Sequence, residues 1–240
     1  MSQHVPSKAM EGDAQSERLV WDLPLRLFHW SLVICVVGSY VTAKLGFDYR
    51  QQHFWFGYTL LGLLVFRLIW GVVGPRHARF ASFVATPRRL REYARNLAAG
   101  NESRTAGHNP LGALSIVAFL LLLTAQVSSG LFMDDDILYS GPWMHTVSGD
   151  VQDTLETVHT TSINFLLGLI ALHIIAVSYY AVIRRRKIVR AMITGKAQVS
   201  EDQAIPHSRL WLSVIIAAIS IALVYWLVVI APPPAPDSFF

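Results

Sequence analysis

The sequence contains a single cysteine, Cys35, in 240 residues. One cysteine cannot form an internal disulfide. It also excludes a CxxCH attachment site for c-type haem, a cysteine-ligated iron–sulfur cluster and a structural zinc site of the cysteine type. Because Cys35 lies within the apolar run SLVICVVGS, we interpret it as a small apolar side chain.

Charged residues are also scarce, at 15% of the chain, whereas 53% of the residues are hydrophobic. This balance is typical of integral membrane proteins rather than of soluble domains. The first 20 residues are polar and lack the apolar h-region of a cleavable signal peptide. We therefore expect a disordered or loosely held tail over 1–20, and the first apolar segment should act as its own insertion signal.

Five apolar segments are long enough to cross a hydrocarbon core about 30 Å thick. We place the membrane helices at about 25–44, 52–74, 110–132, 157–183 and 209–230. The connecting segments are short and leave no room for a soluble domain. The sequence thus predicts an all-α integral membrane protein, with a four-helix transmembrane bundle over 21–195. A fifth transmembrane helix and a Pro-rich C-terminus follow over 196–240.

Lysine and arginine gather on one side of these spans. Seven lie in 75–110, seven in 184–209 and three in the first 26 residues, against only Lys44 and Arg50 on the other side. By the positive-inside rule the basic side is cytoplasmic, so we expect the N-terminus inside and the C-terminus outside. Topology thus explains the net charge of +4, and no nucleic-acid partner is expected.

The outer loop 133–157 carries acidic residues and no lysine or arginine. The acidic residues are Asp134, Asp135, Asp136, Asp150, Asp153 and Glu156. Such a loop is either simply solvated or a docking surface for a basic redox partner, because complementary charge steers association. The sequence leaves both interpretations open.

Two histidines lie within the apolar fourth segment, although ionisable side chains are costly in hydrocarbon. The 14-residue spacing of His159 and His173 places them about 40° apart around a helix and about 21 Å apart along it. His53 opens the second segment on the outer side, and His29 lies early in the first segment on the inner side. Depth alone therefore predicts two pairs, His53 with His159 outside and His29 with His173 inside.

Two histidines at each of two levels suit a b-type haem, whose iron accepts axial imidazoles from facing helices. A zinc or copper site needs three or four ligands at one level. We therefore predict two haem b groups in the four-helix bundle, with the four paired histidines as axial iron ligands. Small residues that leave room for a macrocycle are Gly38, Gly57, Gly62, Gly130 and Gly168. We interpret the other histidines as structural or solvated, with His145 a minor candidate for an external site.

Two arginines lie close to the predicted inner haem. Arg67 in the second segment either snorkels to the surface or neutralises a haem propionate. Arg26, three residues before His29, is a similar candidate. The third segment carries polar residues that we expect to form helix–helix hydrogen bonds rather than to bind a substrate. These are Gln126, Ser128 and Ser129.

Several stretches resemble the bacterial cytochrome b561 / nickel–iron hydrogenase b-type cytochrome family. VWDLPLRLFHWSL contains His29, and HFWFGYTLLGLLVFRLIWGVVGPRHARF contains His53 and Arg67. The resemblance continues through GHNPLGALS, QVSSGLF and the His159–His173 pair, and it covers about 20–195. The four histidines match the family's ligand positions one for one.

The resemblance implies a cytochrome of the bacterial inner membrane that binds two b haems and exchanges electrons with quinone. Family members work with a periplasmic iron–sulfur subunit of hydrogenase, with c-type cytochromes, or alone on quinone or superoxide. We expect the lipid bilayer, quinone and a periplasmic redox protein near 133–157 as partners. The main hypothesis is an electron-transfer subunit. The alternatives are a self-contained quinone oxidoreductase acting on superoxide or a similar substrate, and a membrane anchor whose histidines merely pack.

Overall fold

The computed structural model describes residues 16–84, 86–101, 107–134 and 139–234. Within this part, five helices are long and apolar enough to cross a membrane. They are α1 (Leu23–Leu45), α2 (Arg50–Val73), α5 (Pro110–Gly130), α6 (Gly149–Ser178) and α8 (Leu210–Tyr225). Short π-helical stretches, Tyr179–Ile183 and Trp226–Ile230, extend α6 and α8. The all-α, multi-pass membrane architecture expected from the sequence is therefore confirmed.

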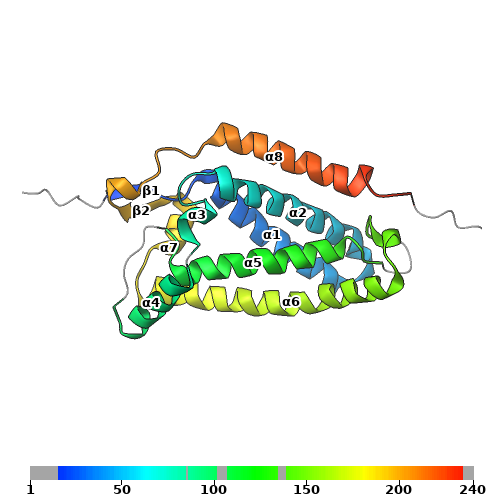
Figure 1. Ribbon diagram of the computed structural model, residues 1–240, viewed down its shortest axis with the longest axis horizontal. Helices are drawn as coiled ribbons and strands as arrows, with labels where there is room; N and C mark the ends of the chain where they lie inside the picture. The colour runs from blue at the N-terminus through cyan, green and yellow to red at the C-terminus, as the bar shows by residue number, and fades with distance from the viewer. Residues whose placement is uncertain (1–15, 85, 102–106, 135–138, 235–240) are drawn as a thin grey trace, which may run out of the picture.

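The bundle is built from two helical hairpins (Figure 1). α1 packs against α2, and α5 packs against α6. The hairpins meet where α2 packs against α5, and α8 lies along α2 on the outside of the bundle. As a result α2 is the most enclosed of the spans, with buried side chains such as Leu60, Leu64 and Trp70.

Two apolar clusters hold the helices together. The larger cluster joins α1, α2, α5 and α6, and its buried members are Cys35, Leu60, Leu64, Leu123, Val127 and Leu166. The second cluster joins α1, α2 and α8, and its buried members are Leu25, Phe66, Trp70, Ala78 and Ile216. Cys35 is a free, buried thiol within the first cluster, as the sequence predicts.

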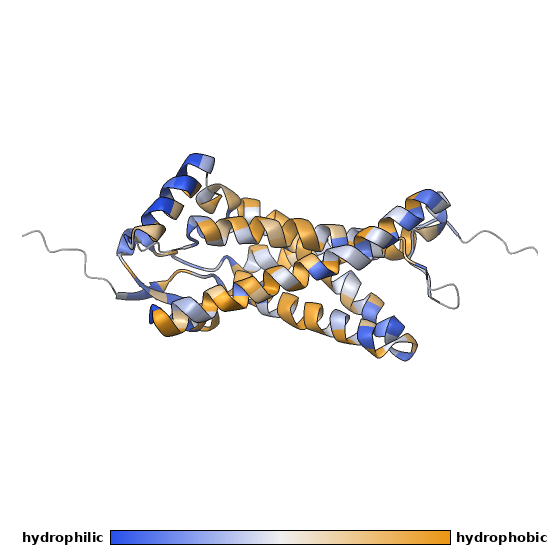
Figure 2. Cartoon of the chain, turned by 90° about the horizontal axis from the view of Figure 1, so that it is seen from below, coloured by the Kyte–Doolittle hydropathy of each residue, from blue (hydrophilic) through white to orange (hydrophobic). Residues whose placement is uncertain are grey.

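The outer faces of the helices are apolar as well. Large side chains such as Leu121, Val182 and Ile221 are 67%, 73% and 69% exposed. Soluble proteins rarely expose continuous apolar surfaces of this extent. Hydrophobic residues cover the middle of the bundle and hydrophilic residues gather at its two ends, as expected for helices surrounded by lipid (Figure 2).

One end of the bundle carries small elements that hydropathy does not predict. They are β1 (Ser16–Leu19), α3 (Phe80–Phe83), α4 (Pro87–Ala98), α7 (Ile188–Thr194) and β2 (Lys196–Val199). β1 and β2 pair antiparallel, with Ser16 opposite Val199 and Leu19 opposite Lys196. Next to them, Gly195 ends α7 at a φ of +82° and accepts the backbone N–H groups of Val20 and Trp21. A glycine suits this left-handed position because it has no Cβ.

The expected disorder of the 1–20 tail is wrong for its last part. Residues 16–19 form β1, and Val20 is fully buried. The reason is a long-range strand pairing with 196–199, which local composition does not reveal. Residues 1–15 lie outside the described part of the chain, as do residues 135–138 of the acidic loop and the last residues of the Pro-rich C-terminus.

The fourth spanning helix begins at Gly149, earlier than the predicted residue 157. Ser148 occupies the N-cap position in an extended conformation, and Asp150 lies in the first turn, where an acidic side chain complements the helix dipole. Hydropathy marks where a helix enters lipid and not where it starts. The first polar turns of α6 therefore extend beyond the apolar stretch.

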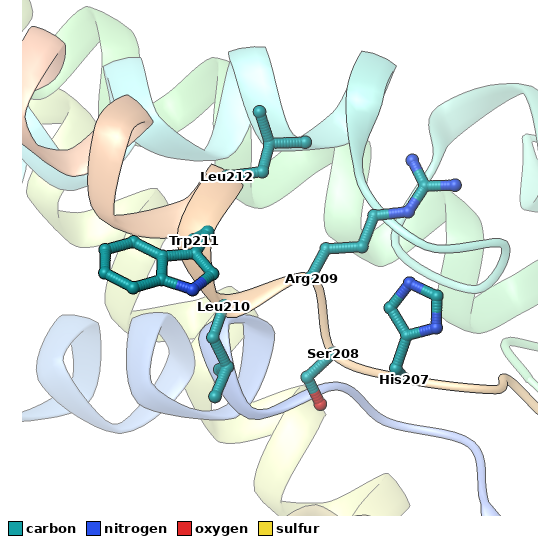
Figure 3. Close-up of a pocket in the computed structure, with 6 residues that line it drawn as sticks. All are labelled: His207, Ser208, Arg209, Leu210, Trp211 and Leu212. Atoms are coloured by element: carbon teal, nitrogen blue, oxygen red, sulfur yellow. The ribbon is translucent and has the colours of Figure 1, made fainter.

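The segment that leads into α8, whose side chains Figure 3 draws as sticks, is attached to the rest of the bundle by short polar contacts. The Leu23 backbone N–H donates to Ser208 Oγ at 3.2 Å, at the start of α1. Arg209 Nη1 donates to the Val73 carbonyl at 2.9 Å, at the end of α2. An open pocket of about 680 Å³ beside this segment is lined by residues 207–212, and none of the four candidate haem ligands lines it.

Candidate functional site

The structure brings His53 and His159 together in the bundle. His53 lies near the start of α2 and His159 lies on α6, and their ring centres are 6.2 Å apart with an interplanar angle of 83°. These helices belong to different hairpins, so the two rings face each other across the bundle. The outer pair expected from depth therefore exists as a spatial pair.

Each hairpin orients its own histidine of this pair. The Nδ1–H of His53 donates to the Ser39 carbonyl of α1 at 2.9 Å, and the Nδ1–H of His159 donates to the Gln126 carbonyl of α5 at 2.9 Å. The Ser39 and Ser129 hydroxyls also lie near these nitrogens, at 3.2 Å and 3.3 Å. A carbonyl accepts only from a protonated Nδ1, so both rings keep a bare Nε2 for a metal.

The distance between the rings fits one metal ion between them. Two metal–nitrogen bonds of about 2 Å each, with each ring centre about 1 Å behind its ligating nitrogen, give a separation of about 6 Å. The observed 6.2 Å agrees with this value. Among the described residues, no group of three or more His, Cys, Asp and Glu side chains is placed to hold a metal. A two-histidine centre fits haem iron better than zinc.

The histidines of the inner pair have fewer contacts that fix their orientation than those of the outer pair. His29 on α1 and His173 on α6 lie close enough to interact electrostatically. His29 Nδ1 is buried and finds no hydrogen-bond partner among the described residues, and the exposed His173 ring stands edge-on to Phe119 at 5.7 Å. Within the described chain α1 and α6 have no extensive packing against each other. His29 Nδ1 therefore lacks the carbonyl partner that orients each histidine of the other pair.

The two candidate arginines have partners within the protein. Arg26 Nη1 donates to the Ile193 carbonyl near the end of α7. Arg67 is buried, donates to the Ala78 carbonyl at 3.1 Å, and lies over the Phe80 ring at 4.6 Å. Their contact with haem propionates stays a prediction.

Sequence reasoning missed a polar cluster at the basic end of the bundle. Asp22, fully buried, accepts from the Leu25 backbone N–H at 2.9 Å and from Trp70 Nε1–H at 3.0 Å. It caps the N-terminus of α1 and ties it to α2. Burial raises the pKa of the Asp22 carboxyl, although its two hydrogen bonds and nearby Arg67 act in the opposite direction. The sequence does carry a signal for this cap, in the stretch WDLP of residues 21–24. An aspartate at the N-cap position followed by a proline in the first turn favours the start of a helix.

A second buried group lies beside this cluster. The ring of His108 packs between Trp21 and Phe83, with ring centres 4.5 Å and 4.8 Å away. Burial lowers the pKa of His108 to about 3, with Arg67 and His77 acting in the same direction. His108 is therefore neutral at physiological pH, which agrees with its interpretation as a structural residue. His145, by contrast, is exposed, and it lies in the segment between α5 and α6.

Of the helix–helix hydrogen bonds expected on the third span, those of Gln126 and Ser129 are present. Ser162 Oγ donates to Gln126 Oε1 at 2.5 Å between α6 and α5. Of the glycines considered as space for a macrocycle, Gly130 lies against a candidate ligand, since a Cβ there would be 3.0 Å from His159 Cε1. Gly38 instead receives the Phe56 ring, and Gly62 faces Val224 of α8. Small residues thus serve both helix packing and the histidine site.

Comparison with known proteins places the chain among b-type cytochromes. Residues 20–195 match the family described as prokaryotic cytochrome b561. A protein of Azotobacter chroococcum named "Probable Ni/Fe-hydrogenase B-type cytochrome subunit" is 24% identical over 223 residues, covering 79% of this chain and 92% of the relative. Proteins with the same name from Azotobacter vinelandii and Bradyrhizobium diazoefficiens are 25% and 23% identical, with the same coverage. No solved structure gives a significant match.

The family match spans most of the chain and includes the helices that carry both histidine pairs. b-type cytochromes of the membrane bind haem b through such side chains and transfer electrons. This chain belongs to the prokaryotic cytochrome b561 family.

Proposed function

We propose that this protein binds two haem b groups and relays electrons between the membrane quinone pool and a periplasmic redox partner. The observation that carries the proposal is the facing pair His53 and His159, with each Nδ1 held by a backbone carbonyl of its own hairpin. A histidine that merely packs has no need of a fixed tautomer. A ligand does, because its other nitrogen must be bare.

The residues have separate tasks at the two levels. His53 and His159 hold the outer iron, and Ser39 and Gln126 fix their orientation through carbonyl groups. His29 and His173 hold the inner iron. A bound haem would supply a one-electron iron couple, and the histidines of each pair would hold its iron for electron transfer. The histidines of α6 are about 21 Å apart along the helix, so the two centres lie toward opposite membrane surfaces.

The family and its named relatives support the proposed partners. The relatives are named as hydrogenase cytochrome subunits, which favours an iron–sulfur subunit of a hydrogenase as the redox partner, with a c-type cytochrome as the other candidate. Quinone rests on the family resemblance. The basic residues favour a cytoplasmic N-terminus, so the outer pair would face the periplasm.

The polar start of α6 is the proposed docking surface. Asp150, Asp153 and Glu156 are exposed and follow each other at intervals of three residues. Side chains at this spacing lie on neighbouring positions of one helix surface. The docking surface therefore lies on the same helix as His159 and on the outer side of it.

Neutralising this surface is expected to slow association with a basic partner. The variant Asp150→Asn, Asp153→Asn, Glu156→Gln should lower the association rate roughly tenfold or more at low salt, because charge steering is strongest there. Stopped-flow reduction by the partner at several salt concentrations measures the effect. Lys44→Gln, which removes a basic charge from the same side, is the control. An unchanged rate at low ionic strength would count against docking at α6.

The first test of the proposal is the haem content of the purified, detergent-solubilised protein. Pyridine haemochrome spectra should give two non-covalent b haems per polypeptide. One haem per chain would mean that one histidine pair is only structural. A chain without haem, made under haem-replete conditions, would overturn the proposal.

A further inference from the structure

Helix α4 (Pro87–Ala98) is divided lengthwise into a basic face and an apolar face. At about 100° per residue, Arg88, Arg91 and Arg95 fall within one sector of about 60°, whereas Arg89 lies outside this sector. Leu90, Tyr93 and Leu97 share the opposite sector. They are the described α4 residues that are buried or half-buried, whereas the arginines are exposed.

The basic face is incompletely neutralised. Arg88 forms an exposed ion pair with Glu92 at 2.9 Å, one turn along the helix. Among the described residues, Arg89, Arg91 and Arg95 have no acidic partner. Exposed like charges on one face repel each other unless a counter-charge lies nearby. Arg91 and Arg95, without a counter-charge on the same face as Arg88, therefore favour an anionic surface as the partner of this face.

The position of α4 indicates which anionic surface is available. α4 packs against α5 near the start of that helix, where the apolar spans end. It forms a hydrophilic projection beside the ends of the spanning helices (Figures 1 and 2). This is the depth of lipid headgroups in a bilayer. The long arginine side chains can reach phosphates from there while the apolar face stays on the protein.

We propose that the arginine face of α4 binds the headgroups of anionic phospholipids at the basic end of the bundle. The arginine fork matches a phosphate geometrically and by charge. The site follows from the membrane placement of the spans and does not depend on haem or on the redox partner. We therefore expect the protein to prefer anionic phospholipids, and we expect this preference to depend on the residues of α4.

The test compares lipid binding by the full-length protein in detergent. Native mass spectrometry with phosphatidylglycerol and phosphatidylcholine of identical acyl chains reports the preference for the anionic lipid. Each basic residue near an anionic surface strengthens binding about fivefold, so the variant Arg88→Gln, Arg91→Gln, Arg95→Gln should reduce the preference on the order of a hundredfold. Glu92→Gln should increase it, because it adds one net positive charge and releases Arg88. A misfolded variant would not show a gain.

A matched control removes the same charge from other elements at the same end. Arg79, Arg185 and Lys196 are exposed and lie on three separate segments. Changing all three to glutamine should reduce the preference clearly less than the α4 variant does, because residues on separate segments cannot share one headgroup site. Equal losses in both triple variants would overturn a site on α4. They would indicate that the basic charge of this whole end of the bundle attracts the lipid. An absence of any preference in the unmodified protein would overturn it as well and would favour an acidic protein as the partner of α4.

Discussion

Replacing either His53 or His159 with alanine is expected to remove one and the same haem, the outer one. Replacing His29 or His173 should remove the inner haem instead. The reason is geometric, since the two histidines of a pair would hold the same iron. Redox titration followed by optical spectra distinguishes the two centres and counts the haems that remain in each variant.

His145→Ala is the matched control, because this histidine is exposed and belongs to neither pair. It should keep both haems and both spectra. If His53→Ala and His173→Ala were to delete the same centre, the pairing would be wrong. Loss of both haems in every histidine variant would indicate that folding, and not ligation, is being measured.

The two centres are expected to differ in their affinity for haem. The outer histidines are held by carbonyl groups at 2.9 Å, whereas His29 Nδ1 has no hydrogen-bond partner among the described residues. Hydrogen-bond partners of a ligating histidine typically change metal affinity about 10- to 100-fold. Gradual extraction of haem should therefore empty the inner centre first.

Asp22→Ala is expected to destabilise the protein by about 2–4 kcal/mol. The substitution removes the N-cap of α1, which contributes about 1 kcal/mol, and leaves the buried Trp70 Nε1–H without an acceptor, which costs about 1–3 kcal/mol. Unfolding in mixed micelles, followed by circular dichroism, measures the change. Because Asp22 also links α1 to α2, the His29 haem should become easier to extract.

Asp22→Asn is the conservative control and should lie within about 1 kcal/mol of the unmodified protein, since asparagine caps helices as well as aspartate does. Burial raises the pKa of Asp22 in the folded state. The folded protein thus binds a proton at a pH where the unfolded chain has released it. Stability therefore falls as the pH rises above the unfolded value of about 3.9, up to the folded pKa. Asp22→Asn should lack this decrease, and an equal decrease in both would argue against Asp22 as its source.

The candidate ligands can be identified from the sequence because the depth of a residue in the membrane follows from its position along an apolar helix. Once His29, His53, His159 and His173 were assigned to spans of alternating direction, their levels followed without knowledge of side-chain packing. The structure then showed His53 facing His159 at 6.2 Å. Helix boundaries were less accessible, as the early start of α6 at Gly149 shows.

The groups that orient the ligands cannot be identified from the sequence. The carbonyls of Ser39 and Gln126 carry no sequence signal, because every residue has a carbonyl and only helix pairing decides which one meets an imidazole. The same applies to Asp22 and Trp70, which lie 48 positions apart and meet where α1 starts and α2 ends.

By itself the sequence determined that this protein has five segments long and apolar enough to span a membrane, with histidines at two levels, because hydropathy is a local property of the chain. Only the tertiary structure decided which nitrogen each outer histidine leaves free, which arginines are already engaged, and that α4 turns a basic face outward. These features arise from contacts between distant segments, and such contacts exist only once the helices have packed.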